Sequence, residues 1–218
     1  MRKATIFIAL NALCTWTLAG NLQISVLDKE GKPVADAVVV VTPSAKVEPK
    51  SPLPALVTIS QEKMRFIPEV SIVPVGGKLR LVNNDPWDHH VRSSPAGAGQ
   101  FSAGTTGFEV RLEGKSDGKV AKSADVTLDK VGALSAALLG CHIHGSMRGY
   151  VYVTDSPWTA RTGADGVASF TDLPDGAARI VTWQADQLVD LPAQSVTVGP
   201  APAKASFQLG VVPRRRRG

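Results

Sequence analysis

The chain has 218 residues, of which 44% are hydrophobic and 20% charged, enough for one or two domains with buried cores. Its 24 basic residues exceed its 19 acidic ones, but two basic residues lie at the N-terminus and four in the C-terminal run RRRR. The body between them is close to neutral. This argues against a nucleic-acid-binding surface, which needs basic residues distributed over a fold.

Residues 1–19, MRKATIFIALNALCTWTLA, have the organisation of a secretory signal peptide. Two basic residues precede an apolar stretch, and Ala19 ends a small-residue cleavage site. The apolar stretch is shorter than the roughly 20 residues of a membrane-spanning helix. We therefore expect an exported protein, periplasmic or secreted, with no membrane insertion after signal cleavage. A lipid anchor on Cys14 is disfavoured by the residues that precede it.

Nearly every later segment with a readable pattern predicts a β-strand. Apolar and polar residues alternate in NLQISVLD, and AVVVVTP is a β-branched run. Strands are also expected on both sides of Gly76-Gly77 and in GYVYVTD, AARIVTWQ, QSVTVG and ASFQLG. GALSAALLG (132–140) has a helix-friendly composition, but it is short and flanked by glycines, so we interpret it as a strand. Many short strands with turn signals between them predict an all-β chain of β-sandwiches.

Segments rich in proline, glycine or serine separate these strands. Residues 44–54, SAKVEPKSPLP, are expected to cross between domains, and TDSPW (154–158) to leave a strand sharply. Residues 93–107 are expected to form a long surface loop. The terminal RRRR is interpreted as a disordered, soluble end.

The cysteine count draws attention to the stretch GCHIHGSMRGYVYV (140–153). If Cys14 is removed with the signal peptide, Cys141 is the one thiol of the mature protein. An exported protein lies in an oxidising compartment, where an unpaired cysteine is a liability unless it is buried, used covalently or bound to a metal. His144 and Met147 follow Cys141 in steps of three residues. An upstream segment, LRLVNNDPWDHHVRSS (79–94), places a histidine pair after a strand and an Asn-Asn-Asp turn.

Two imidazoles, a thiolate and a weak axial thioether form the ligand set of electron-transfer copper sites. A Cys–His hydrolase is the other chemical use of these residue types. It is disfavoured because the sequence shows neither a recognisable nucleophile context nor an orienting partner. A binuclear copper centre would need a second cysteine. Trp87, beside the histidine pair, is interpreted as packing or surface.

These two segments resemble those of the cupredoxin family of blue copper proteins, and the Cys-x-x-His-x-x-Met spacing is similar to that of amicyanins. The paired histidines and GCxIHxxMxGYxxV also resemble exported methylamine-utilisation or plastocyanin-like proteins. The resemblance to cupredoxins covers roughly residues 58–155. It implies a mononuclear type 1 copper site. Its ligands would be His89, Cys141, His144 and Met147.

The chain departs from the cupredoxin pattern at two further histidines. His90 stands where cupredoxins usually have asparagine, and His142 adds an imidazole inside the ligand loop. Either could be an alternate ligand or a second, weaker metal contact. Between the paired histidines we favour His89 as the ligand. Strand alternation should point the two rings to opposite sides of the sheet.

The flanks resemble a different family. VLDKEGKPVADAVVVV and ARTGADGVASFTDLPDGAARIVTW are similar to the two ends of a carboxypeptidase-regulatory-like, transthyretin-like β-sandwich. That resemblance implies a scaffold that holds or presents another domain, and some relatives of the fold bind carbohydrate.

The predicted organisation is a signal peptide (1–19), a split regulatory-like sandwich (20–45 and 156–210), a cupredoxin domain (55–155) inserted in it or packed on it, and a basic tail (211–218). The predicted function is single-electron transfer between periplasmic partner proteins by copper, without enzymatic activity. The alternatives are copper storage, delivery or resistance, and a structural or carbohydrate-associated module without a redox role. The redox partner and the oligomeric state do not follow from the sequence.

Overall fold

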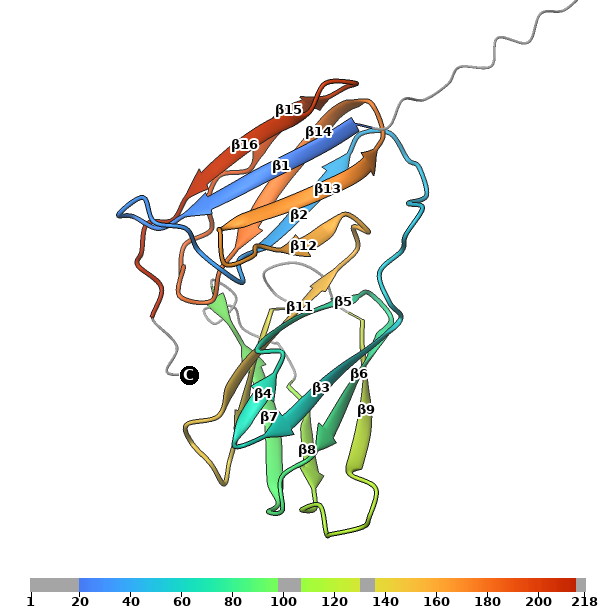
Figure 1. Cartoon of the computed structure of the whole chain (residues 1–218), viewed down its shortest axis with the longest axis vertical. Coiled ribbons are helices and arrows are strands. Elements are labelled where there is room, and N and C mark those ends of the chain that lie inside the picture. The colour runs from blue at the N-terminus through green and yellow to red at the C-terminus, as the bar shows by residue number, and fades with distance from the viewer. Residues whose placement is uncertain (1–19, 98–106, 130–135, 215–218) are drawn as a thin grey trace, which may run out of the picture.

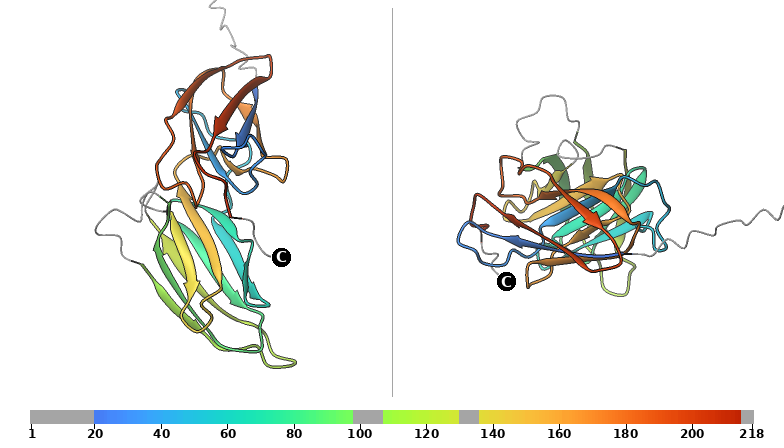
Figure 2. Two further views of the ribbon diagram at one scale, coloured as in Figure 1. Left: turned by 90° about the vertical axis from the view of Figure 1, so that its left-hand side faces the viewer. Right: turned by 90° about the horizontal axis from the view of Figure 1, so that it is seen from above.

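The computed structural model describes residues 20–97, 107–129 and 136–214, and all its named elements are strands (Figure 1). They form two β-sandwiches, the upper and lower bodies of Figure 1 and of the left view of Figure 2. The upper sandwich contains β1 (Gly20–Leu27), β2 (Val38–Pro43), β12 (Thr159–Arg161), β13 (Val167–Leu173), β14 (Gly176–Trp183), β15 (Gln194–Val198) and β16 (Ala203–Gln208). The lower sandwich contains β3 (Leu56–Glu62), β4 (Arg65–Ile67), β5 (Val70–Pro74), β6 (Gly77–Asn83), β7 (His89–Pro95), β8 (Glu109–Leu112), β9 (Lys122–Leu128), β10 (Ala137–Cys141) and β11 (Arg148–Thr154).

The upper sandwich joins the two ends of the chain. Its sheets have the strand orders β13-β1-β16 and β12-β2-β14-β15, so β1 and β2 pair with strands more than a hundred residues later. Leu22, Ile24 and Val26 alternate into its core, as the pattern of this segment predicts. The turn before β13 requires Gly166, whose φ is 73° and whose Cβ would lie 2.8 Å from the carbonyl oxygen of Val26.

The lower sandwich contains the strands between these ends. Its sheets have the orders β4-β3-β6-β9 and β5-β11-β10-β7-β8. Its core is apolar and includes Leu79, Leu81, Val91 and Leu139. Three neighbouring strands, β11, β10 and β7, pair antiparallel, so the segment that contains Cys141 lies directly beside the segment that contains the histidine pair.

The two sandwiches contact each other through a third apolar cluster. The valine run of β2 is buried on both faces: Val39 and Val41 face the upper core, whereas Val38 and Val40 face the lower sandwich. This explains why the run does not alternate with polar residues. Opposite them, Tyr152 of β11 packs against Trp183 with ring centroids 5.7 Å apart.

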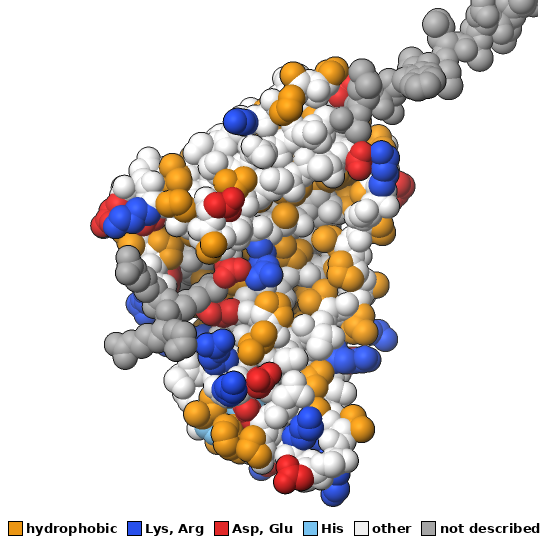
Figure 3. Space-filling view, in the orientation of Figure 1, with side chains coloured by type: hydrophobic (Ala, Val, Ile, Leu, Met, Phe, Trp, Pro, Cys, Tyr) orange, Lys and Arg blue, Asp and Glu red, His pale blue; other side chains and the backbone are white. Residues whose placement is uncertain are grey.

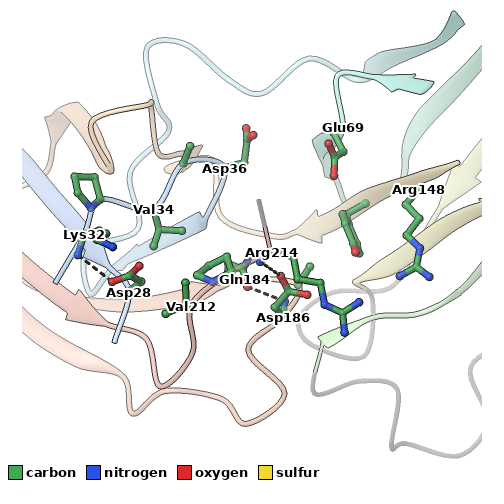
Figure 4. Close-up of a pocket in the computed structure, with 15 residues that line it drawn as sticks. Asp28, Lys32, Val34, Asp36, Glu69, Arg148, Gln184, Asp186, Val212 and Arg214 are labelled. Carbon is green, nitrogen blue, oxygen red and sulfur yellow. Dashed lines mark hydrogen bonds between the residues drawn. The ribbon is translucent and has the colours of Figure 1, made fainter. Parts of the chain in front are cut away.

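A pocket of about 450 Å³ lies where the sandwiches meet (Figure 4). Side chains of both charges line it, and Figure 4 shows Lys32 beside Asp28 and Arg214 beside Asp186. The carboxylates of Asp28 and Asp186 accept the backbone N–H groups of Lys32 and Arg214.

The prediction of an all-β fold of sandwiches is confirmed. Over residues 65–85 the structure adds the short strand β4 to the two strands expected there. GALSAALLG is a strand from Ala137 onward, and its beginning lies outside the described residues. The expected signal peptide, most of the loop at 93–107 and the last four residues of the tail also lie outside them. No helix in the described ranges has the length and apolar character needed to cross a membrane.

Candidate metal centre

The turn between β6 and β7 positions His89 at the start of β7, with its side chain fully buried. Buried Asn83, at the end of β6, organises this turn. Its amide nitrogen lies 2.9–3.2 Å from the carbonyl oxygens of Trp87, Leu112 and Glu113. Its amide oxygen accepts the backbone N–H of Asp85 at 3.0 Å. The loop that leads to His89 is therefore tied to β8 by one side chain.

Asp85 fixes the orientation of the His89 ring. Its Oδ2 atom lies 2.9 Å from His89 Nε2, and its carboxylate also accepts the backbone N–H groups of Lys63 and Met64. Burial by itself would raise the pKa of Asp85, but the hydrogen bonds from Met64, His89 and Lys63 hold that pKa below its ordinary value. An ionised carboxylate can only accept a hydrogen bond, so Nε2 is the donor, and in a neutral imidazole Nδ1 keeps a free lone pair.

That lone pair faces Cys141 and His144. Cys141 ends β10 and is 5% exposed, and His144 is half-buried in the loop that follows. The Nδ1 atoms of His89 and His144 are 3.2 Å apart, and each lies 3.7 Å from Cys141 Sγ. The three residues form a group that could hold a metal ion.

The dimensions of this triangle fit a trigonal metal site. Metal–nitrogen bonds of about 2.0 Å and a metal–sulfur bond of about 2.3 Å, separated by ~120°, place the two nitrogens roughly 3.5 Å apart and each nitrogen roughly 3.7 Å from the sulfur. The observed N–S distances match and the N–N distance is slightly shorter. The donor atoms therefore already lie near the positions that a bound ion requires.

Met147, the fourth sequence-predicted ligand, lies just before β11 and is 1% exposed. Its backbone N–H donates to the carbonyl oxygen of His144 at 3.0 Å, which closes the loop, and its side chain belongs to the same apolar core as Cys141.

The two alternate ligands lie on the other face of the sheet. His90 points away from the core, and the structure places its Nε2 atom 3.7 Å from Glu109. His142 Nε2 lies 3.2 Å from the same carboxylate. The backbones of the two segments are nevertheless joined, because the N–H of His142 donates to the carbonyl oxygen of His90 at 2.9 Å.

Two exposed apolar residues, Trp87 and Ile143, lie next to His144 in space and in the chain, respectively. Trp87 lies edge-on to His144 with ring centroids 6.5 Å apart, and Trp87 and Ile143 are both more than two-fifths exposed. Figure 3 shows histidine at the surface of the lower sandwich beside a group of hydrophobic side chains.

Sequence reasoning missed Asp85 and Glu109. A signal for Asp85 was present, because a carboxylate four residues before a candidate ligand histidine can reach its second ring nitrogen. Asp85 also supplies the orienting partner whose expected absence counted against a Cys–His hydrolase. Burial of the Cys141 thiol still disfavours that chemistry, because a nucleophile must reach its substrate.

No protein-family model matches this chain, and neither does any curated protein. Solved structures do. A Cu-containing nitrite reductase from Thermus scotoductus SA-01 is 23% identical over 52% of this chain and 25% of its own, with a TM-score of 0.36. A reduced amicyanin variant is 20% identical over 53% of this chain and 99% of its own, with a TM-score of 0.35. Another amicyanin variant, in the Cu(I) form, is 21% identical over 52% and 98%, with a TM-score of 0.35.

Proposed function

We propose that this chain is an exported copper protein that transfers single electrons between periplasmic partners. A mononuclear type 1 copper would be held by His89, Cys141 and His144, with Met147 as the axial ligand. The observation that carries the proposal is the triangle of two imidazole nitrogens and one cysteine sulfur, with sides of 3.2, 3.7 and 3.7 Å.

The donor set favours copper over other metals. Thiolate and thioether sulfurs suit Cu(I), whereas imidazole nitrogens also accept Cu(II), so this combination supports both oxidation states. Copper would supply the one-electron chemistry, and the chain would supply fixed geometry. Asp85 holds His89 in place, and the buried surroundings of Cys141 keep water from the thiolate.

The partner would dock where the centre comes closest to solvent. His144 is half-buried, whereas His89 and Cys141 are buried, so an electron would leave through the His144 edge. Trp87 and Ile143 give this edge an apolar surface suited to a transient protein contact. The upper sandwich would be a carboxypeptidase-regulatory-like scaffold that presents the copper domain.

Copper storage, delivery or resistance is the second candidate function. His90 and His142 favour it, because additional imidazoles beside a copper site could take part in metal exchange. A carrier must retain copper in both oxidation states, whereas a delivery protein must release it.

An absorption spectrum of the purified protein with Cu(II) tests the copper site. We expect an intense thiolate-to-copper charge-transfer band that Cys141→Ser abolishes. Ser146→Ala, five residues further along the same loop and without a proposed metal contact, should leave the band intact. A colourless protein that binds copper equally well with serine at position 141 would reject a type 1 site.

Voltammetry and chelator stripping then separate the two functions. For a carrier, Met147→Gln should lower the reduction potential by stabilising Cu(II) while copper stays bound. Substitution of His90 or His142 by alanine should change retention little. Fast stripping that depends on either histidine, with no reversible couple, would support delivery instead.

A further inference from the structure

The outer face of the sheet β5-β11-β10-β7-β8 brings His90 and His142 together. Strand alternation turns His89 and Cys141 into the core, so the next residues point outward: His90 on β7, and His142 immediately after the end of β10. The backbone hydrogen bond from His142 N–H to the His90 carbonyl makes the two residues direct cross-strand neighbours. Their ring centroids are 4.9 Å apart.

A carboxylate from the next strand meets both rings. Glu109 of β8 lies opposite Arg92, two residues along β7 from His90, and a long side chain reaches such a diagonal neighbour. Its Oε1 atom is 3.2 Å from His142 Nε2, and its Oε2 atom is 3.7 Å from His90 Nε2. The two contacts use different oxygens of Glu109, so one ion with ligands about 2.0–2.1 Å away requires these exposed side chains to turn toward a common point.

We propose that His90, His142 and Glu109 form a second metal site, which takes a divalent transition-metal ion such as Zn(II). Two imidazoles and one carboxylate suit such ions. All three side chains are at least one-third exposed, so a bound ion keeps positions open to water or an external ligand. This site lies across the sheet from the Cys141 centre and does not depend on copper there.

The charges around the second site lower its affinity for a metal ion below that of the Cys141 centre. Arg92 lies opposite Glu109, and Arg111 lies opposite His90, where it pairs with Asp88 at 3.3 Å. Two neighbouring guanidinium groups oppose a divalent cation. Together with the exposure of the ligands, they make binding weaker than at the buried centre.

Calorimetric titration of the untagged, copper-loaded protein with Zn(II) tests this site. We expect one further ion per chain, with the absorption of the first centre unchanged. Glu109→Gln and His142→Ala should each weaken zinc binding by at least about tenfold. Glu113→Gln is the matched control, because Glu113 is an exposed glutamate just after β8 that pairs with Lys122, and it should bind zinc like the unmodified protein.

The alternative is that Glu109 and the histidines form an ion pair only. No zinc binding beyond copper would establish that alternative. Zinc binding unchanged in both variants would show that the ion binds elsewhere, and either result would overturn the second site. Should the protein fail to retain copper on gel filtration, the copper proposal fails separately. The same titration then starts from metal-free protein and is expected to show two zinc ions per chain, one of which is lost with Glu109→Gln.

Discussion

The Nε2 atom of His89 lies 2.9 Å from Oδ2 of Asp85, and both side chains are buried. This contact leaves Nδ1 of the imidazole facing Cys141 and His144. The same carboxylate accepts two backbone N–H groups from the turn at Lys63 and Met64. One aspartate thus connects the orientation of a candidate ligand with the hairpin of β3 and β4.

Asp85→Ala should therefore weaken both metal binding and folding. Without the carboxylate the His89 ring loses its orientation, and removal of such a partner lowers metal affinity by about 10–100-fold. The buried His89 N–H and the two part-buried N–H groups of Lys63 and Met64 would also lose their acceptor, which costs the metal-free protein roughly 2–3 kcal/mol of unfolding free energy. Chelator competition and urea denaturation measure the two effects.

Asp88→Ala is the control for this prediction. Asp88 accepts hydrogen bonds from Gly114 and Arg111, but its side chain is 42% exposed and its bonds do not reach His89. We expect a smaller loss of stability and no loss of affinity. Equal copper affinity in both variants would show that Asp85 does not position the ligand.

The choice between the paired histidines gives a second prediction. His89→Ala should abolish the charge-transfer band, because it removes the buried nitrogen that completes the triangle with Cys141 and His144. His90→Ala should retain the band, because this ring lies beside Glu109 on the outer face of the sheet. The spectra of the two variants with one equivalent of Cu(II) decide the question, and the reverse result would make His90 the ligand.

A third prediction concerns backbone strain beside the site. Lys63 and Met64 have φ values of 52° and 56°, a region that costs a residue with a side chain about 1–2 kcal/mol. Met64→Gly removes this cost at a position 43% exposed, and the glycine entropy cost offsets part of it, so we expect a net gain of roughly 0.5–1 kcal/mol in thermal or urea unfolding.

Arg65→Gly is the matched control for the turn. Arg65 is also exposed, but it begins β4 and is not among the positive-φ residues, so glycine there should destabilise the protein. If both variants change stability in the same direction, relief of the left-handed conformation is not the cause.

Local pattern was sufficient to predict many of the strands, and it separated an inward His89 from an outward His90. It did not predict five of them: β3, β4, β8, β9 and β12. Alternation depends on near neighbours in the chain, so it can be read from the sequence. The predicted domain boundaries and the family of the upper sandwich remain predictions.

Contacts across the fold could not be read in this way. Asp85 acts on His89 because the turn at 63–64 fixes its carboxylate, and Glu109 meets His90 and His142 because β8 pairs with β7 in one register. The four-residue spacing signals only that Asp85 can reach His89; the position of its carboxylate depends on the turn at 63–64, and the contact of Glu109 depends on the pairing of β7 with β8. A one-residue shift of β8 would have turned Glu109 to the other face of the sheet.

The contact between the two sandwiches gives the last prediction. Tyr152 is buried against Trp183 at this contact. Burial raises its pKa to about 12, and the nearby carboxylates of Asp190 and Asp155 act in the same direction. A tyrosine in the unfolded chain ionises at about pH 10. Between these two values the unfolded chain has lost a proton that the folded chain still holds, so the free energy of unfolding should fall as the pH rises.

The chain contains two tyrosines, so Tyr150→Phe leaves Tyr152 as the sole source of phenolate absorbance. In this variant we expect the folded protein to titrate at about pH 12 and the urea-unfolded protein at about pH 10. By pH 12 the difference corresponds to roughly 2–3 kcal/mol of lost stability. Tyr152→Phe should keep the aromatic packing and remove this component of the alkaline sensitivity. Phenolate formation at pH 10 in the folded Tyr150→Phe protein would mean that water reaches Tyr152 and that the two sandwiches do not stay in contact in solution.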